Sequence, residues 1–142
     1  MALFIFLAFS KTTRKLGIAA IASSVMGLVI SRIVRWVAPR ERPFIALEEV
    51  SPLIEKEASA SFPSEQALIV GIFIALLWLM ENSFKWTGIF LGSMILVSRV
   101  YLGHHYVSDV VIGAVLGISL FVTTNKLSSR KPRFPQEKSL TS

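Results

Sequence analysis

The stretch Leu16–Val37, LGIAAIASSVMGLVISRIVRWV, is apolar except for Arg32 and Arg35 close to its end. Its 22 residues (16 to 37) are enough for a helix to cross about 30 Å of hydrocarbon. Pro39 follows, and a proline at this point ends or bends a helix. The stretch therefore predicts a membrane-spanning helix that carries its charges at one boundary of the bilayer.

Three further apolar runs predict three more crossings, at residues 67–80, 86–103 and 109–124. The first of them needs a few flanking residues to span, and a short polar turn, Glu81–Lys85, separates it from the second. In the last run, Gly113 and Gly117 have the spacing that permits close packing against another helix. Met1–Phe9, at the start of the chain, is about half a helix. We therefore expect an all-α fold, a polytopic transmembrane helix bundle of four full spans plus an amino-terminal partial helix.

The composition supports a membrane protein with an anionic partner. Hydrophobic residues make up 53% of the chain, and lysine and arginine outnumber acidic residues 15 to 9. This balance fits contact with anionic lipid or an anionic substrate. The absence of cysteine excludes disulfides, thiolate metal sites and cysteine nucleophiles. Nucleic acid is not an expected partner, because no soluble domain presents the basic residues.

The basic residues gather at the two ends of the apolar region. Those before and after the spans are Lys11, Arg14 and Lys15, then Lys126, Arg130, Lys131, Arg133 and Lys138. The positive-inside rule therefore predicts cytoplasmic termini in a multi-pass plasma-membrane protein. Four crossings then bring the loops at residues 39–65 and 103–108 together on the extracytoplasmic side. We divide the chain into a membrane-embedded domain, residues 1–125, and a basic cytoplasmic tail, residues 126–142.

Three arginines, Arg35, Arg42 and Arg99, lie at span ends on the predicted outer side. A guanidinium at a hydrocarbon boundary is costly unless it is paired, extended to the interface or directed at an anion. Its planar shape suits a phosphoryl group, whose oxygens accept paired hydrogen bonds. Interfacial anchoring is the alternative for any one arginine, but three on one face favour an anion site.

His105 and Asp109 are four residues apart, so at the start of a helix they lie on one face. The carboxylate can keep one imidazole nitrogen protonated and leave the other as a nucleophilic lone pair, whereas His104 points elsewhere. A helix cap and an interfacial histidine are the alternative interpretation. Ser64 and Gln66 stand at a predicted helix start, where N–H groups and a hydroxyl offer a phosphate cradle. Ser64 as a simple helix cap is the alternative there.

These clusters resemble the three-part signature of the type 2 phosphatidic acid phosphatase superfamily. The first motif, a basic residue, six positions and Arg-Pro, is matched by Arg35 and Arg42-Pro43. The second motif, Pro-Ser-x-His in the family, is here Pro63-Ser64-Glu65-Gln66. The third, Ser-Arg, five positions, His, three positions and Asp, is complete as Ser98-Arg99, His105 and Asp109. The wording of residues 59–64, SASFPS, is similar to bacterial undecaprenyl pyrophosphate phosphatases of the bacitracin-resistance type, which act in cell-wall synthesis.

The resemblance covers most of the chain, from Leu16 to the end of the last span, and implies a helix bundle with an extracytoplasmic site. It implies that His105 attacks the terminal phosphoryl group to form a phosphohistidine that water hydrolyses, with Asp109 orienting the ring. No metal or cofactor is implied. The residues implied to bind the phosphate oxygens are Arg35, Arg42, Ser64 and Arg99. The implied substrate is a polyprenyl (undecaprenyl) pyrophosphate lipid of the membrane bilayer.

The chain departs from the family pattern in two places. Family members have six spans, so we expect the first span and part of the second to be missing here. Gln66 stands where a histidine acts as general acid toward the leaving group, and an amide cannot deliver a proton at neutral pH. A pyrophosphate substrate reduces the effect of this loss, because its leaving group is already a stable phosphate monoester.

Three alternative functions remain open at this point. The chain can be a phosphatidic acid or phosphatidylglycerophosphate phosphatase, which only substrate assays distinguish. Gln66 favours a catalytically impaired relative that binds lipid phosphates without turnover. A permease component is disfavoured, because no span carries a polar stripe along its middle.

The topology can be tested with single cysteines in a chain that has none. Glu48→Cys, in the loop between the first two full spans, should react with a membrane-impermeant thiol reagent in intact cells. Ser83→Cys and Pro135→Cys should react only after lysis, because both are predicted to face the cytoplasm. Labelling of position 83 but not of position 48 would invert the predicted orientation.

Overall fold

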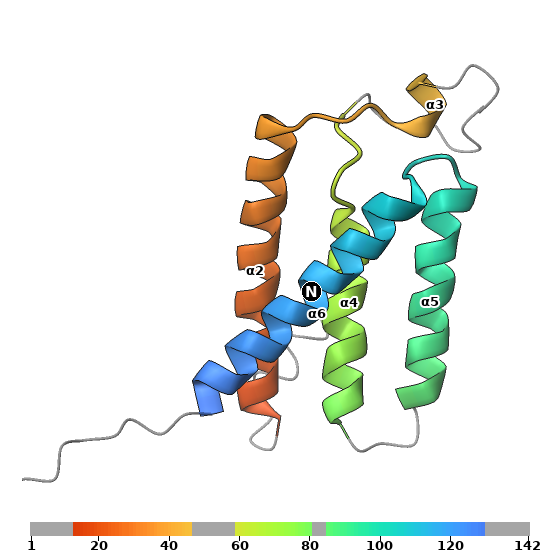
Figure 1. Ribbon diagram of the computed structural model, residues 1–142. Coiled ribbons are helices and arrows are strands. Elements are labelled where there is room, and N and C mark those ends of the chain that lie inside the picture. Colours follow the sequence, from red (N-terminus) through yellow and green to blue (C-terminus); the bar gives the residue numbers. More distant parts are fainter. Residues whose placement is uncertain (1–12, 47–58, 81–84, 130–142) are drawn as a thin grey trace, which may run out of the picture.

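The computed structural model describes residues 13–46, 59–80 and 85–129, and within them every regular element is a helix. The helices are α2 (Arg14–Val37), α3 (Pro43–Ala46), α4 (Glu65–Leu79), α5 (Lys85–Tyr101) and α6 (Val107–Ser129). In Figure 1, α2, α4 and α5 stand side by side, and α6 runs obliquely from the upper end of α5 across α4 to the lower end of α2. The end of α2, all of α3 and the starts of α4 and α6 lie at the upper end of the bundle. The segments that carry the predicted site therefore converge at one end.

Helix α4 forms the centre of the bundle. After its first two residues it is apolar throughout, and it packs against α2, α5 and α6. A helix that is apolar on every side is one that other elements surround. The buried core consists of Ala19, Ala20, Leu68, Ile72, Ala75, Leu76 and Phe121. Helix α5 packs mainly on α4, with little contact to α6, and Gly92 is its one buried residue.

The backbones of α4 and α6 approach each other closely at glycines. A Cβ atom added at Gly117 would lie 2.1 Å from the carbonyl oxygen of Leu68, and one at Gly113 would lie 2.5 Å from that of Ser64. A Cβ atom at Gly71 of α4 would likewise lie 2.2 Å from a backbone oxygen of α6. No side chain fits at these points without moving a helix. The prediction that Gly113 and Gly117 permit close packing is confirmed.

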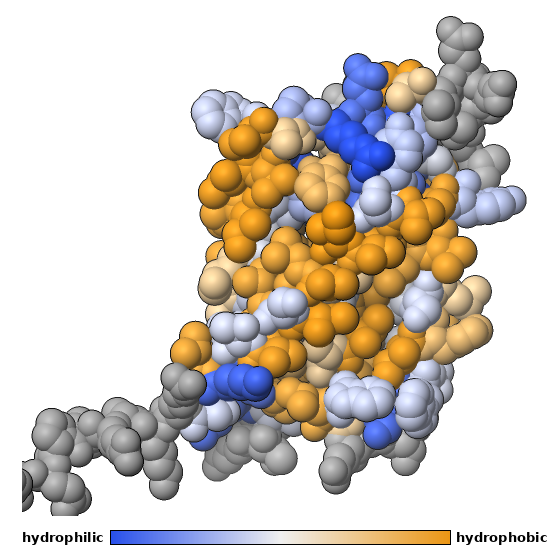
Figure 2. All heavy atoms as spheres, in the orientation of Figure 1, coloured by the Kyte–Doolittle hydropathy of each residue, from blue (hydrophilic) through white to orange (hydrophobic). Residues whose placement is uncertain are grey.

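The outer surface of the bundle is apolar over its middle. Figure 2 shows an apolar band between two ends where hydrophilic residues gather. Exposed large apolar side chains of α2, α5 and α6 include Val25, Val29, Ile33, Phe90, Met94, Val97, Val111 and Val115. A surface of this kind fits hydrocarbon rather than water.

Two helices, α2 and α6, are long and apolar enough to cross a membrane by length and composition. Helix α4 has 15 residues and α5 has 17. At 1.5 Å per residue these helices are about 22 and 26 Å long, less than a hydrocarbon core of about 30 Å. The prediction of four full spans is therefore not confirmed, and the described residues hold two candidate spans as well as the shorter apolar helix α4 and the 17-residue helix α5. Helix α4 begins after the Ser64 cap and ends at Leu79. The apolar run did not predict these bounds closely, because hydropathy alone does not set helix ends.

The remaining helix boundaries differ from the expected ones by a few residues. Helix α2 begins at Arg14, and α6 begins at Val107 and continues to Ser129, past Thr124. The first proline after Thr124 is Pro132, so no helix breaker stands where we expected the tail to begin. The predicted amino-terminal partial helix, the turn at residues 81–84 and most of the tail lie outside the described residues.

We expect Gly117→Ala to destabilise the bundle by about 1–3 kcal/mol, the usual range for overpacking a tight contact. The added Cβ meets a backbone carbonyl, which cannot rotate away. Gly92→Ala is the control, because a Cβ there meets the side chain of Val70 at 3.2 Å, which can adjust. Thermal unfolding in detergent measures both variants, and equal melting temperatures would contradict the close helix contact.

Candidate active site

Two loop segments meet at the end of the bundle where α2 ends and α4 begins. Ser61 donates from its backbone N to the carbonyl of Arg40 at 2.8 Å and from its hydroxyl to the carbonyl of Glu41 at 3.2 Å. The starts of α4 and α6 are also joined, because Ser64 N donates to the carbonyl of Asp109 at 3.2 Å. These backbone contacts bring the three sequence motifs together.

The Arg42 side chain is the buried centre of the site, with 1% of its surface exposed. Its Nη1 donates to the carbonyl of His104 at 2.8 Å and lies 3.4 Å from Nε2 of His105. Its Nη2 donates to the hydroxyl of Ser59 at 2.9 Å. The guanidinium therefore joins both loop segments to the turn before α6.

The Arg42 guanidinium lies among other charges. Burial lowers its pKa, the neighbouring charge of Arg35 lowers the pKa further, and the carboxylates of Asp109 and Glu65 raise it. Arg42 stays a cation, because an arginine side chain does not lose its proton in proteins. The site thus holds a permanent positive charge almost out of contact with water.

His105 is 1% exposed, and its ring is held from both sides. Nδ1 lies 2.8 Å from the carbonyl oxygen of Ser61, which can only accept a hydrogen bond, so Nδ1 carries the proton. In the neutral ring Nε2 is then the acceptor, and it faces Nη1 of Arg42 at 3.4 Å. The ring therefore presents a lone pair toward a guanidinium, in the form that a nucleophilic histidine needs.

Asp109 is fully buried in the first turn of α6. Its Oδ1 accepts a hydrogen bond from Arg40 at 2.9 Å, and its Oδ2 accepts one from the backbone N of Tyr106 at 3.0 Å. Nδ1 of His105 lies 3.9 Å from Oδ2, beyond hydrogen-bond reach. The carbonyl of Ser61 therefore orients the ring of His105, a role that we expected Asp109 to have. Asp109 also caps α6, in agreement with the alternative interpretation.

The other two predicted arginines lie next to this network. Arg35 donates from Nη2 to the carbonyl of Pro63 at 3.1 Å and forms an ion pair with Glu65 at 3.3 Å. Arg99 contacts the network through its backbone, because its carbonyl accepts a hydrogen bond from the backbone N of His105 at 3.3 Å. The side chain of Arg35 and the backbone of Arg99 are therefore tied to the segments that carry the site.

Three buried donors of these arginines have no hydrogen-bond partner among the described residues, namely Nε of Arg35, of Arg42 and of Arg99. A buried donor without a partner costs about 1–3 kcal/mol. Phosphoryl oxygens, like carboxylate oxygens, are strong acceptors for guanidinium N–H groups. In the described part of the chain, no group of three or more histidine and carboxylate side chains is placed to hold a metal ion. The donor set therefore fits an anion.

Ser64 and Gln66, at the start of α4, have different surroundings. The Ser64 hydroxyl is buried and accepts a long hydrogen bond, 3.4 Å, from the N of Ala67, so it caps the helix. Gln66 is exposed, and with Glu65 it lines a hollow of about 340 Å³ whose other walls are apolar. Among the described residues, Gln66 thus lies outside the network around Arg42.

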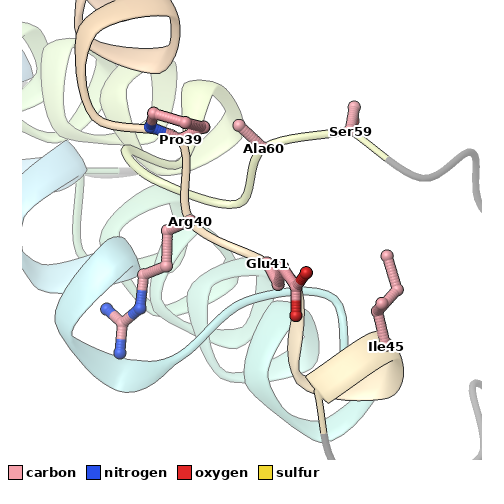
Figure 3. A pocket seen from close by; sticks show the side chains of 6 residues that line it. All are labelled: Pro39, Arg40, Glu41, Ile45, Ser59 and Ala60. Atoms are coloured by element: carbon pink, nitrogen blue, oxygen red, sulfur yellow. The ribbon is translucent and has the colours of Figure 1, made fainter.

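A second hollow, of about 390 Å³, opens beside this network. Figure 3 shows the side chains that line it, from Pro39, Arg40, Glu41, Ile45, Ser59 and Ala60. The Arg40 side chain turns away from Glu41 and Ile45, and its guanidinium meets Asp109. The predicted site residues did not include Arg40, Ser59 and Ser61, which belong to the network. A signal existed for Arg40, a basic residue two positions before Arg42 in the same loop, whereas Ser61 acts through a backbone carbonyl that every residue has.

Comparison with known proteins adds relatives of named activity. The sequence profile of the PAP2 superfamily matches residues 16–133. An undecaprenyl-diphosphatase of Sulfolobus acidocaldarius is 32% identical over 123 residues, which cover 86% of this chain and 60% of that protein. The bacitracin transport permease protein BcrC of Bacillus licheniformis is 33% identical over 119 residues, which cover 81% of this chain and 59% of that protein. The undecaprenyl-diphosphatase BcrC of Bacillus subtilis is 33% identical over 114 residues, which cover 77% of this chain and 58% of that protein. The chain thus spans about 60% of the length of these relatives.

A solved structure has the same fold. It is the crystal structure of a transmembrane PAP2-type phosphatidylglycerolphosphate phosphatase from Bacillus subtilis, with a TM-score of 0.68. The sequence identity is 24%, and the match covers 94% of this chain and 71% of the other. The helices here are therefore arranged as in a transmembrane PAP2 protein.

We expect His105→Ala to lower the release of phosphate from a substrate by at least about 10⁴-fold and to abolish any trapped phosphoenzyme, because we expect Nε2 to be the attacking atom. His104→Ala is the matched control. The His104 ring packs edge-to-face on Phe44, with centroids 6.2 Å apart, so its loss should leave both signals detectable. Turnover by His105→Ala at the wild-type rate would overturn the assignment of the site.

Proposed function

The chain belongs to the PAP2 superfamily, and on this basis we propose that it is a membrane lipid-phosphate phosphatase that removes the terminal phosphate of a polyprenyl diphosphate. One observation carries the proposal, a buried His105 whose Nε2 lone pair faces the guanidinium of Arg42, an arginine with an unsatisfied Nε donor. The relatives named undecaprenyl-diphosphatase support undecaprenyl diphosphate as the substrate. The distribution of basic residues supports a site on the extracytoplasmic face of the plasma membrane.

In the proposed first step, the Nε2 lone pair of His105 attacks the terminal phosphorus, and the bond from phosphorus to the bridging oxygen breaks. The electron pair of that bond leaves with the polyprenyl monophosphate. The imidazole keeps its Nδ1 proton and becomes a cation, which the Ser61 carbonyl at 2.8 Å and the Asp109 carboxylate at 3.9 Å stabilise. Water then attacks phosphorus, the N–P bond breaks, its electron pair returns to Nε2, and inorganic phosphate and a proton are released.

The arginines supply the electrostatic part of this reaction. Charge gathers on the phosphoryl oxygens in the transition state, and donors already in place stabilise it without reorganisation. Nη1 of Arg42 lies 3.4 Å from Nε2, so a phosphoryl group that reaches the nucleophile also reaches this donor. Arg35, Arg99 and the hydroxyl of Ser64 complete the proposed set of phosphate contacts.

Gln66 favours a diphosphate over a monoester. Attack on a diphosphate expels a phosphate monoester, which is stable as an anion, whereas attack on a monoester expels an alkoxide that needs a proton. An amide at position 66 cannot supply that proton. Because position 66 holds no acid, the second candidate function is that of a catalytically impaired relative that binds lipid phosphates. A phosphatidic acid or phosphatidylglycerophosphate phosphatase is the third candidate.

Purified protein in detergent tests the proposal by release of inorganic phosphate from undecaprenyl diphosphate, phosphatidic acid and a soluble monoester. We expect hydrolysis of the diphosphate, much slower hydrolysis of the two monoesters, and no effect of a chelator. Binding of the diphosphate without turnover would support the impaired relative instead. No binding and no hydrolysis of any of the three would refute a lipid-phosphate function.

Gln66→His should raise monoester hydrolysis at least about tenfold more than diphosphate hydrolysis, because it restores an acid with a pKa near 6.5 where the leaving group needs one. Tenfold corresponds to about 1.4 kcal/mol in the barrier and is readily measured. Gln66→Asn, which supplies no acid, is the control and should gain nothing. Equal gains on both substrates would point to a positional role for residue 66.

A further inference from the structure

Arg40 is held by contacts that reach both groups flanking the nucleophilic ring. Its Nη1 donates to Oδ1 of Asp109 and to the hydroxyl of Ser108, each at 2.9 Å. The guanidinium also lies over the ring of Tyr106, 3.9 Å from the ring centroid. Its backbone carbonyl accepts the hydrogen bond from Ser61 N at 2.8 Å. One residue thus fixes the carboxylate by charge and the histidine-binding carbonyl by its backbone.

We propose that Arg40 is a positioning residue for the nucleophile, which pairs with Asp109 and so keeps His105 neutral with its lone pair on Nε2. A carboxylate beside an imidazole favours the protonated ring. A protonated ring has no lone pair with which to attack phosphorus. Because Arg40 occupies Oδ1, the pull of the carboxylate on the ring is weaker, and the ring stays hydrogen-bonded to the carbonyl of Ser61.

The balance of charges around His105 shows why one more cation matters. The charged groups of the site come from α2, the loop after it, α4, α5 and α6, and they are Arg35, Arg40, Arg42, Arg99, Glu65 and Asp109. The neighbouring His104 adds a positive charge only when protonated. Four cations against two carboxylates leave a surplus of two positive charges, and removal of Arg40 halves that surplus. A phosphate ligand then brings more negative charge, which draws a proton onto His105.

A merely structural role for Arg40 predicts a different outcome. The Arg40 side chain is 44% exposed while that of Asp109 is fully buried, so removing Arg40 strands a buried carboxylate and destabilises the site. Loss of structure lowers activity equally at every pH. Loss of the charge pairing lowers it mainly at acidic pH, where His105 takes up a proton.

The chain has two histidines, so NMR of protein labelled with isotopic histidine in detergent follows the titration of His105 directly, with His104→Gln to assign the signals. Arg40→Gln should raise the titration midpoint of His105, and Asp109→Asn should lower it. Arg40→Lys, which keeps the charge, should leave the midpoint close to that of the wild type. Arg32→Gln removes one positive charge from an exposed position of α2 and, as the matched control, should not move it.

The kinetic measurement rests on the proposed function. The ratio of wild-type to Arg40→Gln kcat/KM should grow as the pH falls, by tenfold for each unit that the midpoint moves. An unchanged or lowered midpoint in Arg40→Gln overturns the inference. If that variant does not fold, Tyr106→Leu removes the ring beneath the guanidinium and should raise the midpoint by a smaller amount, and no rise overturns the inference equally. A wild-type protein that hydrolyses none of the substrates defeats the proposed function alone, because the histidine titration needs no turnover.

Discussion

The direct contact between the backbones of α4 and α6 is the constraint on which the rest of the structure depends. Glycines permit it, since Gly117 faces the carbonyl of Leu68 and Gly113 faces that of Ser64 with no room for a side chain. The same contact places the first residues of both helices side by side, where Ser64 N donates to the carbonyl of Asp109. Packing inside the bundle and the geometry of the site at its end therefore have one origin.

The polar end of the bundle shows how a membrane protein keeps charge out of water. Backbone carbonyls and hydroxyls of two loop segments surround the guanidinium of Arg42, and the loops bond to each other through Ser61. Polar groups at the edge of hydrocarbon must find partners inside the protein. The arginine Nε donors that remain without a partner are the ones for which a bound phosphate is the natural acceptor.

In the proposed mechanism, a neutral group and a charged group share the support of the nucleophile His105. The carbonyl of Ser61 fixes the ring of His105 and its tautomer without adding charge, while Asp109 stands further away and is paired with Arg40. A histidine that must attack an anion benefits from this division, since a close, unpaired carboxylate would favour the protonated ring.

The sequence by itself determined that the chain is helical and apolar enough for a membrane, because its apolar runs are long and carry their charges at the ends. It also determined that Arg35, Arg42, His105 and Asp109 gather at one end, since successive helices reverse direction, and the motif spacing indicated the family. It did not determine the lengths of α4 and α5, because capping and packing decide where a helix stops. Only the tertiary structure decided what holds His105 and Asp109. Ser61 acts through a backbone carbonyl that has no residue signature, and Arg40 meets Asp109 across 69 positions of chain, a distance at which no local pattern records a contact.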